Sequence, residues 1–192
     1  MVIHLDHVLR TGDWGPVRPG SSRAEVEHLL GVPEGWESGS RGPGSRCATR
    51  WHYGAYELVF REDESLRSIF NESPERLDDA LGFRVEAGLL AGGAGLSLLD
   101  AADTLRAAGI RVWAWRHKVT GAAVLTTEGG VSLQFFGPEG EMPAPGWTLS
   151  ALVVDGQREP EPRLVDAGWA AEWAGARPTR ERPPAPTEGA QP

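Results

Sequence analysis

The stretch PGSSRAEVEHLLGVPEGW, residues 19 to 36, contains one short helix together with its start and stop signals. Ser22 and Glu25 fit a capping box, in which the serine hydroxyl accepts from the amide of residue 25 and the carboxylate accepts from the serine amide. Gly31 ends the helix, because glycine readily adopts a left-handed backbone, and the proline two residues later prevents continuation. These signals predict a helix over 23–30, which is too short to be stable unless it packs against a sheet.

An antiparallel sheet is expected to follow this helix. Alternating apolar residues predict strands over 50–53, 55–60 and 66–70, since a strand with one buried face repeats every second residue. The preceding stretch EGWESGSRGPGSRCAT is rich in glycine and serine and is interpreted as a loop. Trp36 lies in that predicted loop, where it either contacts a partner or covers the core.

A second, weaker copy of the pattern begins at Ser97. The stretch LSLLDAADTLRAAGIRVWAWRH holds a helix with Leu105 on its apolar stripe and continues into a strand. GAYELVF and GGVSLQF align without gaps, which places Gly54 on Gly129, and the helices align with Leu29 on Leu105. We interpret the chain as an α+β fold of two tandem units, each a short helix plus a three- or four-stranded antiparallel meander.

The expected organisation has four parts. The first helix-plus-meander unit spans 1–80 and the second spans 81–154. Residues 155–174 are predicted to form a short C-terminal helix, because RLVDAGWAAEWAG places apolar residues near helical spacing. Residues 175–192 are rich in proline and polar residues, so a disordered tail is expected there.

Composition restricts the class of partner. The formal net charge of −8 disfavours nucleic acid and anionic membranes as partners, since both require clustered basic residues, and it suits a basic protein partner.

No apolar run approaches the roughly 18 residues of a membrane span, and the N-terminus lacks the apolar region of a signal peptide. With one cysteine, Cys47, no intramolecular disulfide can form. We therefore expect a cytoplasmic protein.

The motifs VRPGSSRAEVEHLLGVPEGW, RWHYGAYELVF and LRSI together resemble the BamE/SmpA-like pattern. The resemblance covers about residues 16–70 well and 96–154 loosely, and a tandem pair of such units is the architecture of the beta-lactamase-inhibitor-protein fold. The chain departs from the secreted members in having no lipobox cysteine and no paired cysteines. Cytoplasmic proteins of this kind resemble immunity proteins of bacterial polymorphic toxin systems, which implies a non-catalytic module that occludes a toxin or an enzyme.

No catalytic, metal or cofactor site is predicted. His4 and His7 in HLDH have a spacing that could hold a metal, but no third ligand accompanies them. Cys47 and His52 could form a thiol–imidazole pair, but nothing in the sequence orients the histidine. The carboxylate pair Asp100 and Asp103 on the second predicted helix is better explained as a helix cap and a surface residue.

Aromatic residues are predicted to form the partner-binding surface. Trp113 and Trp115 share one face of a predicted strand, and Trp51 and Tyr53 share one face of the matching strand. The pattern leaves open whether these faces are core or open surface, although Trp, Tyr and Arg are the residues that carry interface energy. The predicted contact residues, with an acidic turn that would steer a basic partner, are Trp36, Trp51, Tyr53, Trp113, Trp115, Arg116, Phe136, Glu62, Asp63 and Glu64.

Two hypotheses follow. The first is an immunity or inhibitor protein without catalysis, whose partner is a basic toxin or enzyme. The alternative is an enzyme or small-ligand-binding protein that uses a groove between the two units, lined by His52, His117 and the tryptophans.

Overall fold

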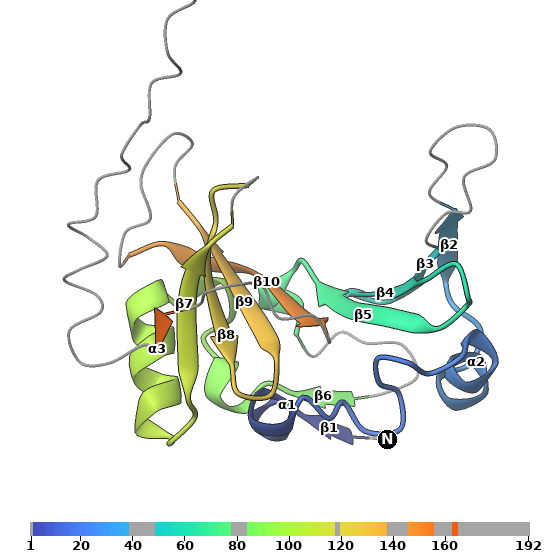
Figure 1. Ribbon diagram of the computed structural model, residues 1–192, viewed down its shortest axis with the longest axis horizontal. Helices are drawn as coiled ribbons and strands as arrows, with labels where there is room; N and C mark the ends of the chain where they lie inside the picture. Colours follow the sequence, from blue (N-terminus) through green and yellow to red (C-terminus); the bar gives the residue numbers. More distant parts are fainter. Residues whose placement is uncertain are drawn as a thin grey trace, which may run out of the picture.

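The protein is an α+β structure built around one large sheet. The computed structural model describes residues 2–38, 49–77, 84–117, 120–137, 146–155 and 163–164. The sheet has nine strands in the order β11-β7-β8-β9-β10-β5-β4-β3-β2, and every neighbouring pair is antiparallel (Figure 1). Its strands are β2 (Gly35–Ser38), β3 (Thr49–Tyr53), β4 (Tyr56–Phe60), β5 (Leu66–Asn71), β7 (Val112–Arg116), β8 (Ala123–Thr127), β9 (Val131–Phe136), β10 (Thr148–Asp155) and β11 (Arg163–Leu164).

The helix that opens the first unit forms as predicted. This helix, α2 (Arg23–Leu30), is capped by Ser22, whose hydroxyl accepts from the Glu25 amide at 3.3 Å. The Ser22 amide in turn donates to the Glu25 carboxylate at 2.7 Å, which completes the capping box. The helix buries Val26 and Leu30 against the sheet, and this packing holds an element that is too short to be stable alone.

The second unit repeats the first. Its helix, α3 (Leu98–Ala107), is capped by Ser97, whose hydroxyl accepts from the Asp100 amide at 3.1 Å. In both units the strand that closes the meander bonds to the chain just before the helix: the Leu66 amide donates to the Ser21 carbonyl, and the Leu149 amide donates to the Leu96 carbonyl. Each unit is therefore one helix followed by a four-stranded meander, β2 to β5 and β7 to β10.

The alignment of the two helices differs from the prediction by one residue. Leu29 was expected to match Leu105, but Leu29 is exposed whereas Leu105 and Leu30 are both buried. Matching Leu30 to Leu105 instead gives the two helices one offset in residue number. The same offset relates the caps Ser22 and Ser97, and it relates the turn residues Gly54 and Gly129. One constant offset thus relates helix, cap and hairpin, as an internal repeat requires.

The two meanders merge into one sheet at their closing strands. β5 pairs with β10, with Phe70 opposite Val153 and Asn71 opposite Leu152. One row of side chains therefore crosses the joined sheet on the face that the helices cover. Its members, from β7 to β3, are Ala114, Leu125, Leu133, Leu152, Asn71, Tyr56 and Tyr53, all buried.

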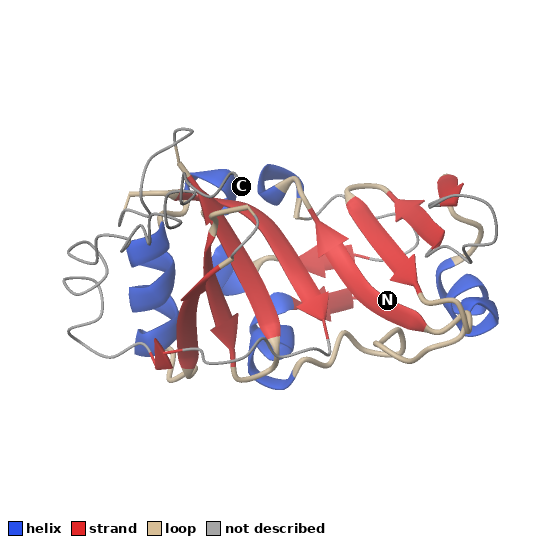
Figure 2. Cartoon of the chain, turned by 45° about the horizontal axis from the view of Figure 1, so that its top comes forward, coloured by secondary structure: helices blue, strands red, loops and turns tan. Residues whose placement is uncertain are grey.

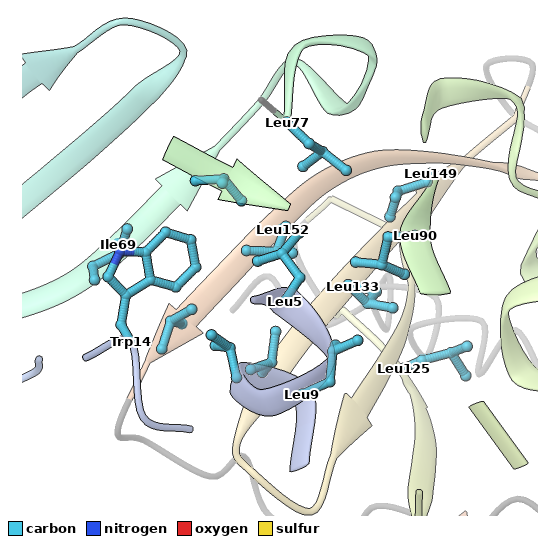
Figure 3. Close-up of a cluster of buried hydrophobic side chains, with 14 of the residues drawn as sticks. Leu5, Leu9, Trp14, Ile69, Leu77, Leu90, Leu125, Leu133, Leu149 and Leu152 are labelled. Carbon is cyan, nitrogen blue, oxygen red and sulfur yellow. The ribbon is translucent and has the colours of Figure 1, made fainter. Parts of the chain in front are cut away.

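The N-terminal residues contribute to the core. The strand β1 (Val2–His4) pairs in parallel with β6 (Arg84–Glu86), and α1 (Leu5–Thr11) follows β1 directly. Figure 3 shows Leu5 and Leu9 of α1 among leucines of the sheet and Leu90. In Figure 1 these elements lie below the sheet, on the same side as α2. Three short 3-10 helices complete this layer: η1 (Pro74–Arg76), η2 (Gly88–Leu90) and η3 (Gly93–Gly95).

The predicted strands form with small changes at their ends, whereas the predicted loop and C-terminal helix are partly replaced by strands. The strands predicted over 50–53, 55–60 and 66–70 are β3, β4 and β5, each shifted at one end by a single residue. The loop predicted from residue 34 is wrong at its start, because Gly35–Ser38 form the strand β2 by pairing with β3. Within the predicted C-terminal helix, Arg163 and Leu164 instead pair with β7.

The rest of the predicted C-terminal helix and the tail over 175–192 lie outside the described residues. Across the part of the chain that is described, the helices are too short and too polar to cross a membrane.

Candidate protein-binding surface

The sheet has a second face, opposite the helices, which we call the open face. Strand register defines it directly, since its residues alternate with those of the buried row. One continuous row of the open face crosses the sheet from β7 to β3: Trp113, Thr126, Ser132, Val153, Phe70, Glu57 and His52. Val153 is buried, and the other six residues of the row are half-buried. Figure 2 gives a second view of this sheet with the helices packed to one side.

Trp113 and Trp115 lie on the open face and not in the core. The residues that alternate with them in β7, Val112 and Ala114, are buried under α3, whereas both tryptophans are half-buried. The sequence left open whether this strand face is core or open surface, and the structure places it on the surface side of the sheet. The indole side chains are the largest on this strand, so they determine the shape of the open face at this end of the sheet.

A hydrogen-bond chain links Trp115 of β7 to β8 and β9. Its Nε1 donates to the Thr126 hydroxyl at 2.8 Å, and that hydroxyl lies 3.2 Å from the Ser132 hydroxyl. The indole therefore crosses from β7 over β8, and its ring centroid lies 5.9 Å from that of His117. A side chain held in this way loses little conformational entropy when a partner packs on it.

Trp113 is flanked by an arginine. The Arg111 guanidinium lies 5.9 Å from the Trp113 ring centroid and donates to the Glu128 carboxylate at 2.9 Å. That hydrogen bond is the main cause of the lowered pKa of Glu128. The ion pair is at the surface, so it orients the arginine over the indole more than it stabilises the fold.

Other predicted residues take different positions. Phe136 is half-buried on the open face, as its alternation with the buried Phe135 requires. Arg116 alternates with Trp115 and so does not share its face; it is exposed, and its Nε donates to the Gly121 carbonyl at 3.3 Å.

Phe70, at the junction of the two units, also belongs to the open face. Sequence reasoning missed it, although its alternation with the buried Ile69 was a usable signal.

The prediction that Tyr53 contacts a partner is wrong. Tyr53 and Trp51 do share one face of β3, but it is the face that packs against α2. Tyr53 is fully buried, its hydroxyl donates to the Gly31 carbonyl at 2.9 Å, and burial raises its pKa to about 12. Trp51 is half-buried with its ring centroid 4.7 Å from that of Phe60, as part of the core margin.

Trp36 is the most solvent-accessible of the described tryptophans. It lies on β2 opposite Trp51, and 70% of its surface is exposed. Because it is opposite Trp51, it faces the helix side of the sheet. Trp36 therefore lies near the opposite edge of the sheet from the tryptophans of β7, and on the other face of the sheet.

The predicted acidic residues form the turn between β4 and β5. Glu62, Asp63 and Glu64 are all exposed. Asp63 accepts from the Ser65 hydroxyl at 2.6 Å and from its amide at 3.0 Å, and these bonds lower its pKa. Glu64 adopts a left-handed backbone with φ of 65° and lies 3.5 Å from the Arg23 guanidinium. The turn thus presents three exposed carboxylates at the end of the sheet far from Trp113.

The histidines of the alternative hypothesis do not share a groove. His52 on β3 and the end of β7 at His117 are six strand positions apart, or about 30 Å at the usual strand spacing of about 4.8 Å. Since β5 and β10 pair, the two units meet in a continuous sheet. Two further histidines each lie near a carboxylate: His4 lies 2.9 Å from Glu86, and His7 lies 4.0 Å from Asp13.

Metal-ligating residues do not gather in the part of the chain that the structure describes. Within these ranges, no group of three His, Cys, Asp or Glu side chains is close enough to hold a metal ion. Cys47, which was considered as a partner for His52, lies outside the described residues.

Comparison with known proteins adds little. No protein-family model matches the chain, and no curated protein matches its sequence. One similar solved structure is a DUF4309 family protein (YjgB) from Bacillus subtilis subsp. subtilis, with a TM-score of 0.36 and 13% sequence identity, covering 69% of this chain and 76% of that one. A likeness this distant carries no argument about function.

Proposed function

We propose that this chain is a non-catalytic protein-binding module, an immunity or inhibitor protein that occludes a toxin or an enzyme in the cytoplasm. The observation that carries the proposal is the open face of the sheet, where Trp113 and Trp115 of β7 and Phe136 of β9 are all half-buried. Tryptophans in such positions are the residues that most often supply binding energy at protein interfaces.

The open face is suited to occlusion because its strands lie in one sheet. Strands from both units contribute to it, and the β5–β10 pairing fixes them in one register. The bond from Trp115 to Thr126 keeps the largest side chain in a defined position before a partner arrives. Pre-organised contacts of this kind reduce the entropy lost on binding.

Electrostatics favours a basic partner. The net charge is −8, and the exposed turn of Glu62, Asp63 and Glu64 extends the negative surface. Charge of this sign accelerates the encounter with a basic protein, and the effect weakens as salt concentration rises. The mechanism is steric, so no bond in the partner needs to be made or broken.

Co-expression with the product of a neighbouring gene that is toxic by itself tests the proposal. The chain should restore growth, and the double variant Trp113→Ser, Trp115→Ser should lose that rescue while it still folds. Val2→Ser is the matched control, because Val2 is an exposed apolar residue on the helix side. Failure of the wild-type chain to rescue, or full rescue by the double variant, would contradict the proposal.

A further inference from the structure

Three exposed apolar side chains gather on consecutive elements at the β2 end of the sheet. They are Leu29 on α2, Val32 in the following turn and Trp36 on β2, with exposed fractions of 41%, 73% and 70%. We call this set the β2 corner. Scattered exposed apolar residues are normal, but several within one turn and its flanking elements indicate an interaction site.

The β2 corner includes an edge of the sheet. β2 pairs with β3 on one side, and no described strand pairs with its other side. At the opposite edge, β11 pairs with β7. Edge strands are usually protected by a lysine, a proline or a covering element, and the four residues Gly35–Ser38 contain neither lysine nor proline. Among the described residues, the backbone groups on the outer side of β2 thus have no strand partner.

The charge around the β2 corner is negative. The sequence from residue 24 to 38, AEVEHLLGVPEGWES, contains glutamates but no lysine or arginine. Glu27, Glu34 and Glu37 are exposed. On the adjacent strand, Arg50 lies opposite Glu37 and is bonded to Glu57 at 3.1 Å, and the His52 ring lies 3.9 Å from the Glu37 carboxylate. The next arginines along the chain, Arg41 and Arg46, lie outside the described residues.

We propose that the β2 corner binds an extended, basic segment of a partner protein, which adds to the sheet as a strand beside β2. Its backbone pairs with β2, an apolar side chain packs on Trp36, and lysine or arginine side chains lie against Glu34 and Glu37. Strand addition of this kind takes affinity from backbone hydrogen bonds and specificity from side-chain contacts. The inference rests on the proposed function as a protein-binding module but assigns a surface distinct from the open face.

A second copy of this chain is a poorer occupant of the same edge. Antiparallel pairing of β2 with another β2 would place two acidic segments, each carrying Glu34 and Glu37, side by side. Like charges on opposed strand positions are destabilising. A basic segment removes that repulsion and replaces it with attraction.

Selection from a random twelve-residue peptide display library on the whole purified chain tests the inference. Selected peptides should be enriched in arginine or lysine alternating with apolar residues. Their binding should weaken about tenfold or more in Trp36→Ser, in Glu34→Lys and in Glu37→Lys. N-methylation of alternate amides in a selected peptide should abolish binding, whereas methylation of the intervening amides should not, because only alternate amides pair with β2.

The open-face variant separates the two proposals. Binding of the selected peptides should be unchanged in Trp113→Ser, Trp115→Ser, and that result would stand even if the co-expression test of the open face failed. Peptides without basic enrichment, or binding that survives Trp36→Ser, would overturn the inference. Concentration-dependent dimerisation in light scattering that Trp36→Ser abolishes would also overturn it, in favour of a second copy of the chain.

Discussion

The amide of Gly129 donates a hydrogen bond to the carbonyl of Leu9 at 3.3 Å, which joins the N-terminal helix to the β8–β9 hairpin of the second unit. A β-carbon on Gly129 would lie 2.7 Å from the Val8 carbonyl oxygen and 2.8 Å from that of Leu9, closer than packed atoms tolerate. The helix can therefore approach the hairpin only because glycine occupies this position. The contact spans the whole first unit, so it ties the start of the chain to its repeat.

Replacing Gly129 by alanine should lower the free energy of unfolding by about 1–3 kcal/mol, because the backbone must shift to relieve overpacking. Urea denaturation followed by circular dichroism measures this. Gly95→Ala is the matched control, since a β-carbon there has no neighbour within 4 Å, and it should change stability little. Equal effects of the two substitutions would show that the close approach is not what makes Gly129 necessary.

Removing either helix cap should destabilise the protein. Ser22→Ala and Ser97→Ala each remove a hydroxyl that accepts from a backbone amide, and the expected loss is about 1 kcal/mol in each case. Equilibrium denaturation of the single and double variants gives the measurement. The losses should add, because the two caps belong to different helices; strong coupling between them would contradict the description of two separate caps.

Glu25 should titrate below the ordinary glutamate range. The hydrogen bonds that its carboxylate accepts from the Ser22 amide and hydroxyl hold its pKa below the usual value of a glutamate. A lowered folded-state pKa means that this stabilisation is complete above the unfolded pKa and is lost as the pH falls through the folded one. NMR titration of the Glu25 carboxyl carbon should show the pKa rising in Ser22→Ala. An unchanged pKa in that variant would show that the hydroxyl does not contribute and that the backbone amide, which alanine retains, is the cause.

The Trp115–Thr126 hydrogen bond should be measurable as a coupling. Trp115→Phe removes the donor and Thr126→Val removes the acceptor, and each should lower the free energy of unfolding by about 0.5–1.5 kcal/mol. The double variant should lose less than the sum of the two, as determined by a double-mutant cycle. Perfect additivity would mean that the indole is not held by this bond.

Leu152 should matter most at the junction of the units. It is fully buried between Leu133 of β9 and Asn71 of β5, so Leu152→Ala should cost about 2–5 kcal/mol by lost burial and cavity formation. Val32→Ala, at an exposed position, is the control and should stay within about 0.5 kcal/mol. Thermal unfolding should remain a single transition if the two units form one cooperative sheet; two transitions would contradict that reading.

Part of this architecture was readable from local signals. The capping box at Ser22 and Glu25 and the stop at Gly31 predicted the bounds of α2, and alternation placed β3, β4 and β5 to within one residue. These features depend on residues a few positions apart, so the chain carries them wherever it lies in space. The aligned glycines Gly54 and Gly129 also pointed to the repeat, because both occupy the hairpin between the second and third strands of their meanders.

The rest depended on contacts between residues distant in sequence. Alternation showed that Trp51 shares a face with Tyr53, and that Trp113 shares a face with Trp115. It did not show that the first pair lies under α2 and the second pair on the open face. That choice follows from the pairing of β5 with β10, which brings the two meanders into one register. β2 became a strand only by pairing with β3, and α1 became core only where Gly129 lets it approach the hairpin. Local spacing decides which side chains share a face, whereas long-range packing decides which face is buried, because burial depends on every element that covers it.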